Sequence, residues 1–165
     1  MFQLKSLTRE AVGRALEKAE RYRLLNEPGQ AESICLDILD VDADNQKALV
    51  MLLLARTDQF VHGAGNTQAA HGVLPRLREP YERAYYAGII NERRAGAVLA
   101  HATPESDFIA YGLLRQAMQD YERAEAVRPP GNDDSILRWN TCARILNANP
   151  KLRLREDERG EQPLE

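Results

Sequence analysis

The sequence predicts an all-α fold built from antiparallel helix hairpins. Apolar residues recur at spacings of three and four over most of the chain, as they do on the buried face of a helix, and no segment sustains the alternation of a strand. Clusters of Pro, Gly, Asn and Asp interrupt this pattern, so the chain divides into several helices with short connections. Helices joined that closely pack as antiparallel neighbours.

The first hairpin has the clearest pattern. Its first helix is expected to begin near Ser6 or Thr8, and the run Asn-Glu-Pro-Gly at 26–29 ends it. A second helix is expected just after this run and ends in the acidic turn at 42–45. The two apolar stripes are Val12, Ala15, Leu16, Ala19 and Tyr22, followed by Ala31, Ile34, Cys35, Ile38 and Leu39.

A third helix is expected over residues 46–60, with Asp44 or Asn45 as its N-terminal cap. Residues 48–55 are apolar without interruption, so this helix is apolar around its whole circumference. Such a helix must be covered by other elements on several sides.

The stretch 61–78 is predicted to be a loop that contains a short helix within 67–74, because three glycines and Pro75 exclude a long helix. A long helix follows from about Pro80, a residue suited to the first helical position, and continues to His101.

Two further helices complete the predicted domain. Thr103 and Pro104 resemble a cap and a first helical residue, and the helix they start is expected to end before Pro129. The last helix begins near Ser135 and ends before Pro150. Its inward residues are expected to be Ile136, Trp139, Cys142, Ala143 and Leu146.

The composition fits one domain, assigned to residues 6–148, and a charged, flexible tail at 149–165. The net charge of −3, with acidic and basic residues interspersed, provides no basic stripe for nucleic acid. Cys35 and Cys142 are far apart and are interpreted as small buried residues. The longest apolar run is far shorter than the ~20 residues that span a membrane, and no signal peptide is recognisable. A cytoplasmic protein is expected, although export without a cleaved signal stays open.

Residues 12–45 resemble a tetratricopeptide repeat. Ala19 and Tyr22 stand at the small and aromatic positions of its first helix, and Ala31 stands at the small position of its second. Residues 38–45 resemble the end of the repeat, with Ala43 in place of the usual proline. A partial second unit begins thirty-four residues on, at Gln46. Residues of the same types recur at the matching positions later in the chain, at Ala117, Tyr121, Ala124, Pro129, Trp139 and Ala143.

The resemblance implies a short right-handed superhelix of about three hairpins with a C-terminal capping helix. In this family the first helices of successive hairpins line a concave groove that holds a peptide or helix of a partner. The matching positions here are Glu20, Arg23, Val50, Met51, Leu54 and Asp58. The predicted function is an adaptor or chaperone-like module for an apolar or amphipathic partner segment, since a methionine packs adaptably.

Several alternatives stay open. Val50, Met51 and Leu54 could be buried core rather than groove, and the helices could form an ordinary bundle. The chain could instead be a structural subunit that buries apolar helices against a second copy, so monomer and homodimer are both open. An enzyme with a site around His62 and His71 is a third class, but the sequence has no catalytic triad, phosphate-binding loop or zinc motif, so neither a cofactor nor a metal is expected.

Overall fold

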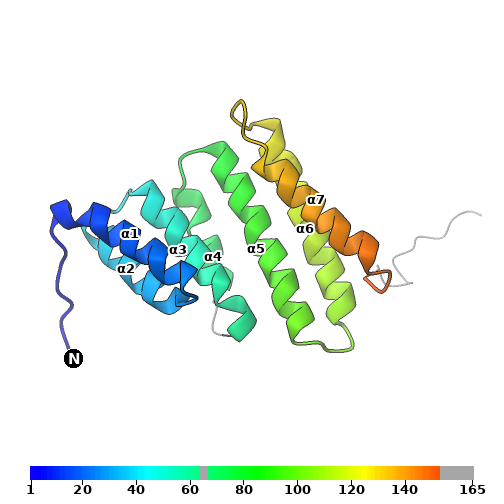
Figure 1. Ribbon diagram of the computed structural model, residues 1–165, viewed down its shortest axis with the longest axis horizontal. Coiled ribbons are helices and arrows are strands. Elements are labelled where there is room, and N and C mark those ends of the chain that lie inside the picture. Colours follow the sequence, from blue (N-terminus) through cyan, green and yellow to red (C-terminus); the bar gives the residue numbers. More distant parts are fainter. Residues whose placement is uncertain (64–66, 153–165) are drawn as a thin grey trace, which may run out of the picture.

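The computed structural model describes residues 1–63 and 67–152, and all of its regular elements are helices. Figure 1 shows them side by side in one row, from the N-terminal helices at one end to α7 at the other. The elements are a 3-10 turn at Arg9–Ala11, α1 (Val12–Leu24), α2 (Pro28–Val41), α3 (Gln46–Asp58), a 3-10 turn at Phe60–His62, α4 (Thr67–His71), a 3-10 turn at Leu74–Arg76, α5 (Pro80–Ala100), α6 (Ser106–Ala126) and α7 (Asp134–Ala148). The predicted all-α class is confirmed.

The first hairpin, α1 and α2, forms where the two apolar stripes predict it. Ala19 of α1 and Ala31 of α2 are fully buried, which lets the two helices approach closely. Two boundaries differ from the prediction. A 3-10 turn precedes α1, which begins only at Val12, and Pro28 is the first residue of α2 rather than part of the break. The reversal instead uses Asn26, whose φ of 58° is left-handed.

Helix α3 is capped by Asn45, one of the two predicted caps. The Asn45 side chain accepts a hydrogen bond of 2.9 Å from the amide of Ala48. The helix ends at Asp58, two residues earlier than predicted, and a 3-10 turn follows that ends at Gly63 with a φ of 68°. The leucines at 49, 52 and 53 are buried, as the all-round apolar pattern predicts.

The segment after α3 contains a short helix, as predicted, but α4 has only 5 residues. Val73 and Leu77 are buried beside the 3-10 turn, so this irregular stretch still covers α3. Residues 64–66, which belong to the predicted loop, lie outside the described residues.

Helices α5 and α6 are the longest elements, with 21 residues each. The predicted start of α6 is wrong: the helix begins at Ser106, because the Thr103 amide donates a 2.7 Å hydrogen bond to the Ser106 hydroxyl in a turn that precedes it. Pro104 therefore lies in the turn rather than at the first helical position.

The core has two parts that meet at α5. One lies among α1 to α4 and the other among α5, α6 and α7, and Leu54 and Tyr86 pack against both. Cys35 and Cys142 are buried and free, as interpreted from the sequence. Leu152 is only 7% exposed, so packing continues four residues past the predicted domain end at 148. The predicted tail beyond it, 153–165, lies outside the described residues.

Among residues 1–63 and 67–152, no helix has the length and apolar character needed to cross a bilayer.

Candidate functional site

Helices α1, α3 and α5 together line a cavity of about 540 Å³, which we call the groove. In Figure 1 the three helices follow one another across the molecule, with α4 drawn between α3 and α5. Each helix presents one stretch of its surface to the same space, so the groove depends on the packing of separate hairpins. Its lining consists of Gly13, Leu16, Glu17, Glu20, Gln46, Lys47, Val50, Met51, Glu82 and Tyr86.

The six residues predicted for a groove divide into two sets. Glu20, Val50 and Met51 line the cavity. Leu54 instead packs between the two parts of the core, while Arg23 and Asp58 form an ion pair further along the same helices. The sequence therefore identified the correct helices, but only half of the six residues border the cavity.

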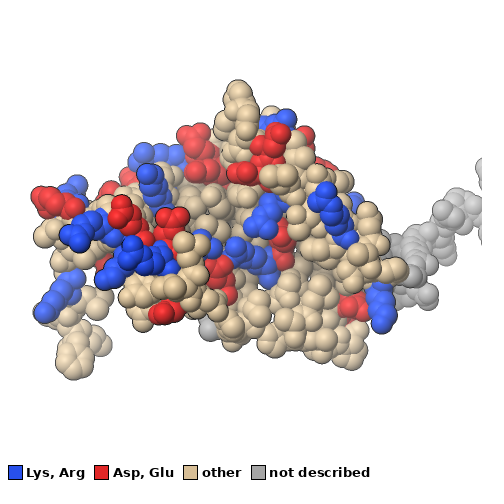
Figure 2. Space-filling model, viewed as in Figure 1, with Lys and Arg blue, Asp and Glu red and all other residues tan. Residues whose placement is uncertain are grey.

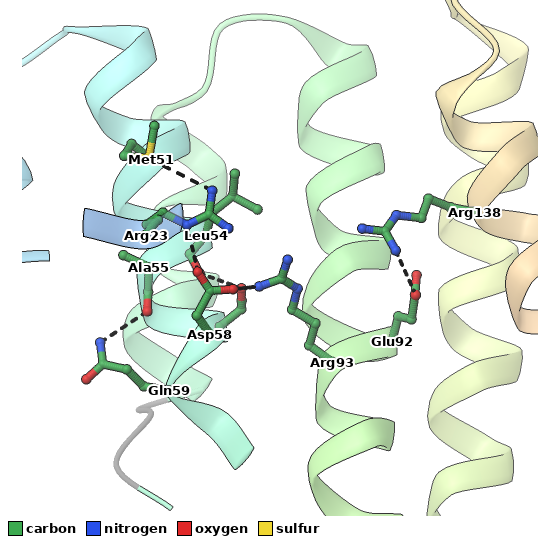
Figure 3. Close-up of polar contacts among 10 residues, drawn as sticks. Arg23, Met51, Leu54, Ala55, Asp58, Gln59, Glu92, Arg93 and Arg138 are labelled. Atoms are coloured by element: carbon green, nitrogen blue, oxygen red, sulfur yellow. Dashed lines mark hydrogen bonds and ion pairs between the residues drawn. The ribbon is translucent and has the colours of Figure 1, made fainter. Parts of the chain in front are cut away.

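Arg23, Asp58 and Arg93 form a row of charges across α1, α3 and α5, which we call the arginine row. Arg23 Nε donates to Asp58 Oδ2 at 2.6 Å, and Arg93 pairs with the other oxygen of the same carboxylate (Figure 3). Side chains in the row are 20–27% exposed, so water screens them only in part. One aspartate of α3 thus joins α1 and α5.

Arg93 makes a further hydrogen bond besides its pair with Asp58. Its Nη1 also donates to the Thr57 hydroxyl at 3.1 Å. Burial, and then the neighbouring Arg23 and Arg138, lower the pKa of Arg93 to about 10, so the guanidinium remains charged at neutral pH.

A second charged cluster joins α5, α6 and α7. Glu92 accepts a 2.6 Å hydrogen bond from the Tyr121 hydroxyl and a 3.1 Å hydrogen bond from Arg138 (Figure 3 shows the Glu92–Arg138 pair). Tyr121 is fully buried, and burial followed by Glu92 raises its pKa. The cluster therefore holds α7 against the long hairpin, and it lies beside the arginine row because Glu92 and Arg93 are adjacent.

The groove combines an apolar floor with an acidic border. Leu16, Val50, Met51 and Tyr86 supply the apolar part; Glu17, Glu20 and Glu82 carry negative charge, and Lys47 alone in this lining carries positive charge. Burial, reinforced by Glu79, raises the pKa of Glu82. Such a surface suits an apolar segment that carries basic residues.

The histidine loop does not join the groove. His62 is exposed and His71 is half-buried; burial and the charge of Arg94 lower the pKa of His71. The neighbouring residues 64–66 lie outside the described ones, and the described residues contain no group of three or more His, Cys, Asp or Glu side chains placed to hold a metal ion.

Sequence reasoning missed the part of the site that α5 contributes. Glu82 and Tyr86 line the groove, and Arg93 completes the arginine row. A signal was present: Arg23 and Asp58 are 35 residues apart, and so are Asp58 and Arg93. The three residues at this constant separation lie on α1, α3 and α5 and contact one another.

Acidic and basic side chains are intermixed over the face shown in Figure 2. Comparisons of the chain with models of known protein families, with characterised proteins and with solved structures found no match.

Proposed function

We propose that this protein is a tetratricopeptide-like adaptor that binds a segment of a partner protein in the groove. The observation that carries the proposal is the single cavity lined by α1, α3 and α5, the first helices of successive hairpins. A lining drawn from three helices is long enough to contact several side chains of one bound segment.

The apolar and acidic side chains of the lining indicate the kind of segment that would bind. Apolar side chains of the segment would cover Leu16, Val50 and Met51, while its Lys or Arg residues would face Glu17 and Glu20. Both glutamates are exposed, so their charges are available to a ligand and their contribution should depend on salt.

The repeat itself is supported by the arginine row. Its constant spacing of 35 residues is close to the repeat length of the tetratricopeptide family, and the buried Ala19 and Ala31 occupy that family's small positions. On this proposal α1–α2, α3–α4 and α5–α6 are three hairpins, with unequal second helices, and α7 is the capping helix.

The proposal is tested by selecting ligands for the full chain from a displayed library of random peptides. We expect recovered peptides to combine apolar and basic residues, and their affinity in fluorescence anisotropy to fall with added salt. The double variant Glu17→Lys/Glu20→Lys should weaken binding by about tenfold or more, roughly 1.4 kcal/mol, because it reverses two charges at the border of the groove.

A matched control carries the same change in net charge elsewhere. Asp40→Lys/Glu125→Lys alters two exposed residues near the C-terminal ends of α2 and α6, where added cations are favourable. This control should bind the selected peptides as the unmodified protein does. Equal effects of the two double variants, or a preference for acidic peptides, would contradict the groove proposal.

A further inference from the structure

A second cavity, of about 310 Å³, lies where the beginning of α5 meets the connection between α6 and α7. We call it the tyrosine pocket, because Tyr81, Tyr85 and Tyr86 contribute to its lining. The rest of the lining is Glu79, Pro80, Glu82, Val127, Pro129, Asn132 and Asp134.

The three tyrosines form an aromatic cluster. The rings of Tyr81 and Tyr85 stack with centroids 5.6 Å apart, and Tyr86 meets Tyr85 edge-on at 5.1 Å with an interplanar angle of 80°. The Tyr81 hydroxyl donates to Asn132 Oδ1 at 3.2 Å, which ties this cluster to the connection before α7. The aromatic side of the pocket therefore belongs to α5, and the Tyr81–Asn132 hydrogen bond joins it to the opposite wall.

The carboxylates of the pocket have no basic partner in the part of the chain that the structure describes. No ion pair joins Glu79, Glu82 or Asp134 to a Lys or Arg there, and no described Lys or Arg belongs to the lining. The nearby Arg128 instead pairs with Asp133 at 3.0 Å. Figure 2 shows acidic side chains gathered over this end of α5 and α7.

Burial is the first cause of the raised pKa values of the pocket's titrating groups, and neighbouring carboxylates add to it. Burial and then Glu79 raise the pKa of Glu82, and burial followed by Glu82 raises the pKa of Tyr86 to about 12. Burial and then Asp134 raise the pKa of Tyr81. A cation would relieve these repulsions, and aromatic faces attract cations as well.

We propose that the tyrosine pocket receives a Lys or Arg side chain from the segment that binds in the groove. The two cavities share Glu82 and Tyr86, so the pocket adjoins the groove and is within reach of a side chain of a segment bound there. The carboxylates supply the charge that a guanidinium or ammonium group pairs with, and the rings cover its apolar stem. This inference rests on the proposed function for the identity of the segment, but the pocket can be tested by itself.

The test titrates Nα-acetylarginine amide into the ¹⁵N-labelled full chain and follows backbone amide shifts by NMR. We expect saturable shifts confined to the start of α5 and to residues 127–134, with weak affinity for so small a probe. Nα-acetylcitrulline amide has nearly the same shape without the charge and should cause no comparable shifts.

Two conservative variants identify the carboxylates involved. Glu82→Gln and Asp134→Asn should each weaken binding of the arginine probe about three- to tenfold, whereas Asp40→Asn, an exposed residue of α2, should leave it unchanged. Equal binding of the citrulline probe, shifts elsewhere, or no effect of either variant would overturn the pocket assignment.

The two proposals fail in different ways. In one outcome, peptides bind the groove and are weakened by Glu17→Lys/Glu20→Lys as expected, but the arginine probe does not bind. This result overturns only the tyrosine pocket. Binding of the arginine probe without any groove ligand keeps the pocket as a cation site and overturns its link to a groove-bound segment.

Discussion

At the scale of single residues, α1, α3 and α5 are joined by charged side chains that share one partner. Asp58 is the central member, because its two carboxylate oxygens pair with Arg23 on one side and Arg93 on the other. Two arginines and one aspartate in a partly buried place leave a net positive charge, so the row depends on that single acid.

Asp58→Asn should lower the free energy of unfolding by about 1–3 kcal/mol, because two partly buried guanidinium groups would face each other without a counter-charge. Urea denaturation measures the loss. Asp44→Asn is the control, since the exposed Asp44–Arg78 pair should contribute less than ~1 kcal/mol. A loss no larger than that of the control would show that the row adds little to stability.

At the scale of elements, the long hairpin α5–α6 is held together by unusually close packing. A Cβ placed at Gly88 of α5 would lie 2.7 Å from Cδ1 of Tyr121 on α6, and Tyr121 is fully buried. The tyrosine ring therefore occupies the space that any side chain at position 88 would need.

Gly88→Ala should lower the free energy of unfolding by about 1–3 kcal/mol, although alanine is the better helix former, because the Tyr121 ring has to move. Gly112→Ala provides the matched control within α6, where a Cβ meets no atom within 4 Å, and it should stabilise the protein by about 0.5–1 kcal/mol. Thermal and urea unfolding of both variants give the comparison. Equal stabilisation by the two substitutions would contradict the packing argument.

At the scale of the whole molecule, two parts of the core are coupled through few side chains. Leu54 of α3 and Tyr86 of α5 contact both parts. In proteins built from repeated hairpins, such contacts between neighbours determine whether the chain unfolds as one unit.

Leu54→Ala should lower stability by about 2 kcal/mol and also weaken this coupling. Trp139, the only tryptophan, reports on α7, whereas far-ultraviolet circular dichroism reports on all helices. We expect the two transitions to coincide in the unmodified protein and to separate in the variant. Leu36→Ala, at an exposed position of α2, should keep them coincident. Coincident transitions in Leu54→Ala would show that the coupling lies elsewhere.

The sequence by itself determined the helices and their order. Stripes at helical spacing mark α1 and α2, and an uninterrupted apolar run marks α3. Asn45 is a cap because its short side chain reaches a free amide at the helix start. Local chemistry of this kind acts over a few residues and can be read along the chain. The start of α6 could not be read in this way: Thr103 and Pro104 have the residue types of a helix start, but the Thr103 amide donates to the Ser106 hydroxyl in a turn that precedes the helix.

Only the tertiary structure decided which side chains share a space. Met51 borders the groove, whereas Leu54, three residues later on the same helix, packs against both parts of the core. The contribution of Glu82 and Tyr86 depends on where α5 lies beside α3, a relation between residues far apart in the chain. A stripe of apolar residues indicates that a helix face is covered. The way in which the helices cross determines which residues cover that face and where a cavity remains.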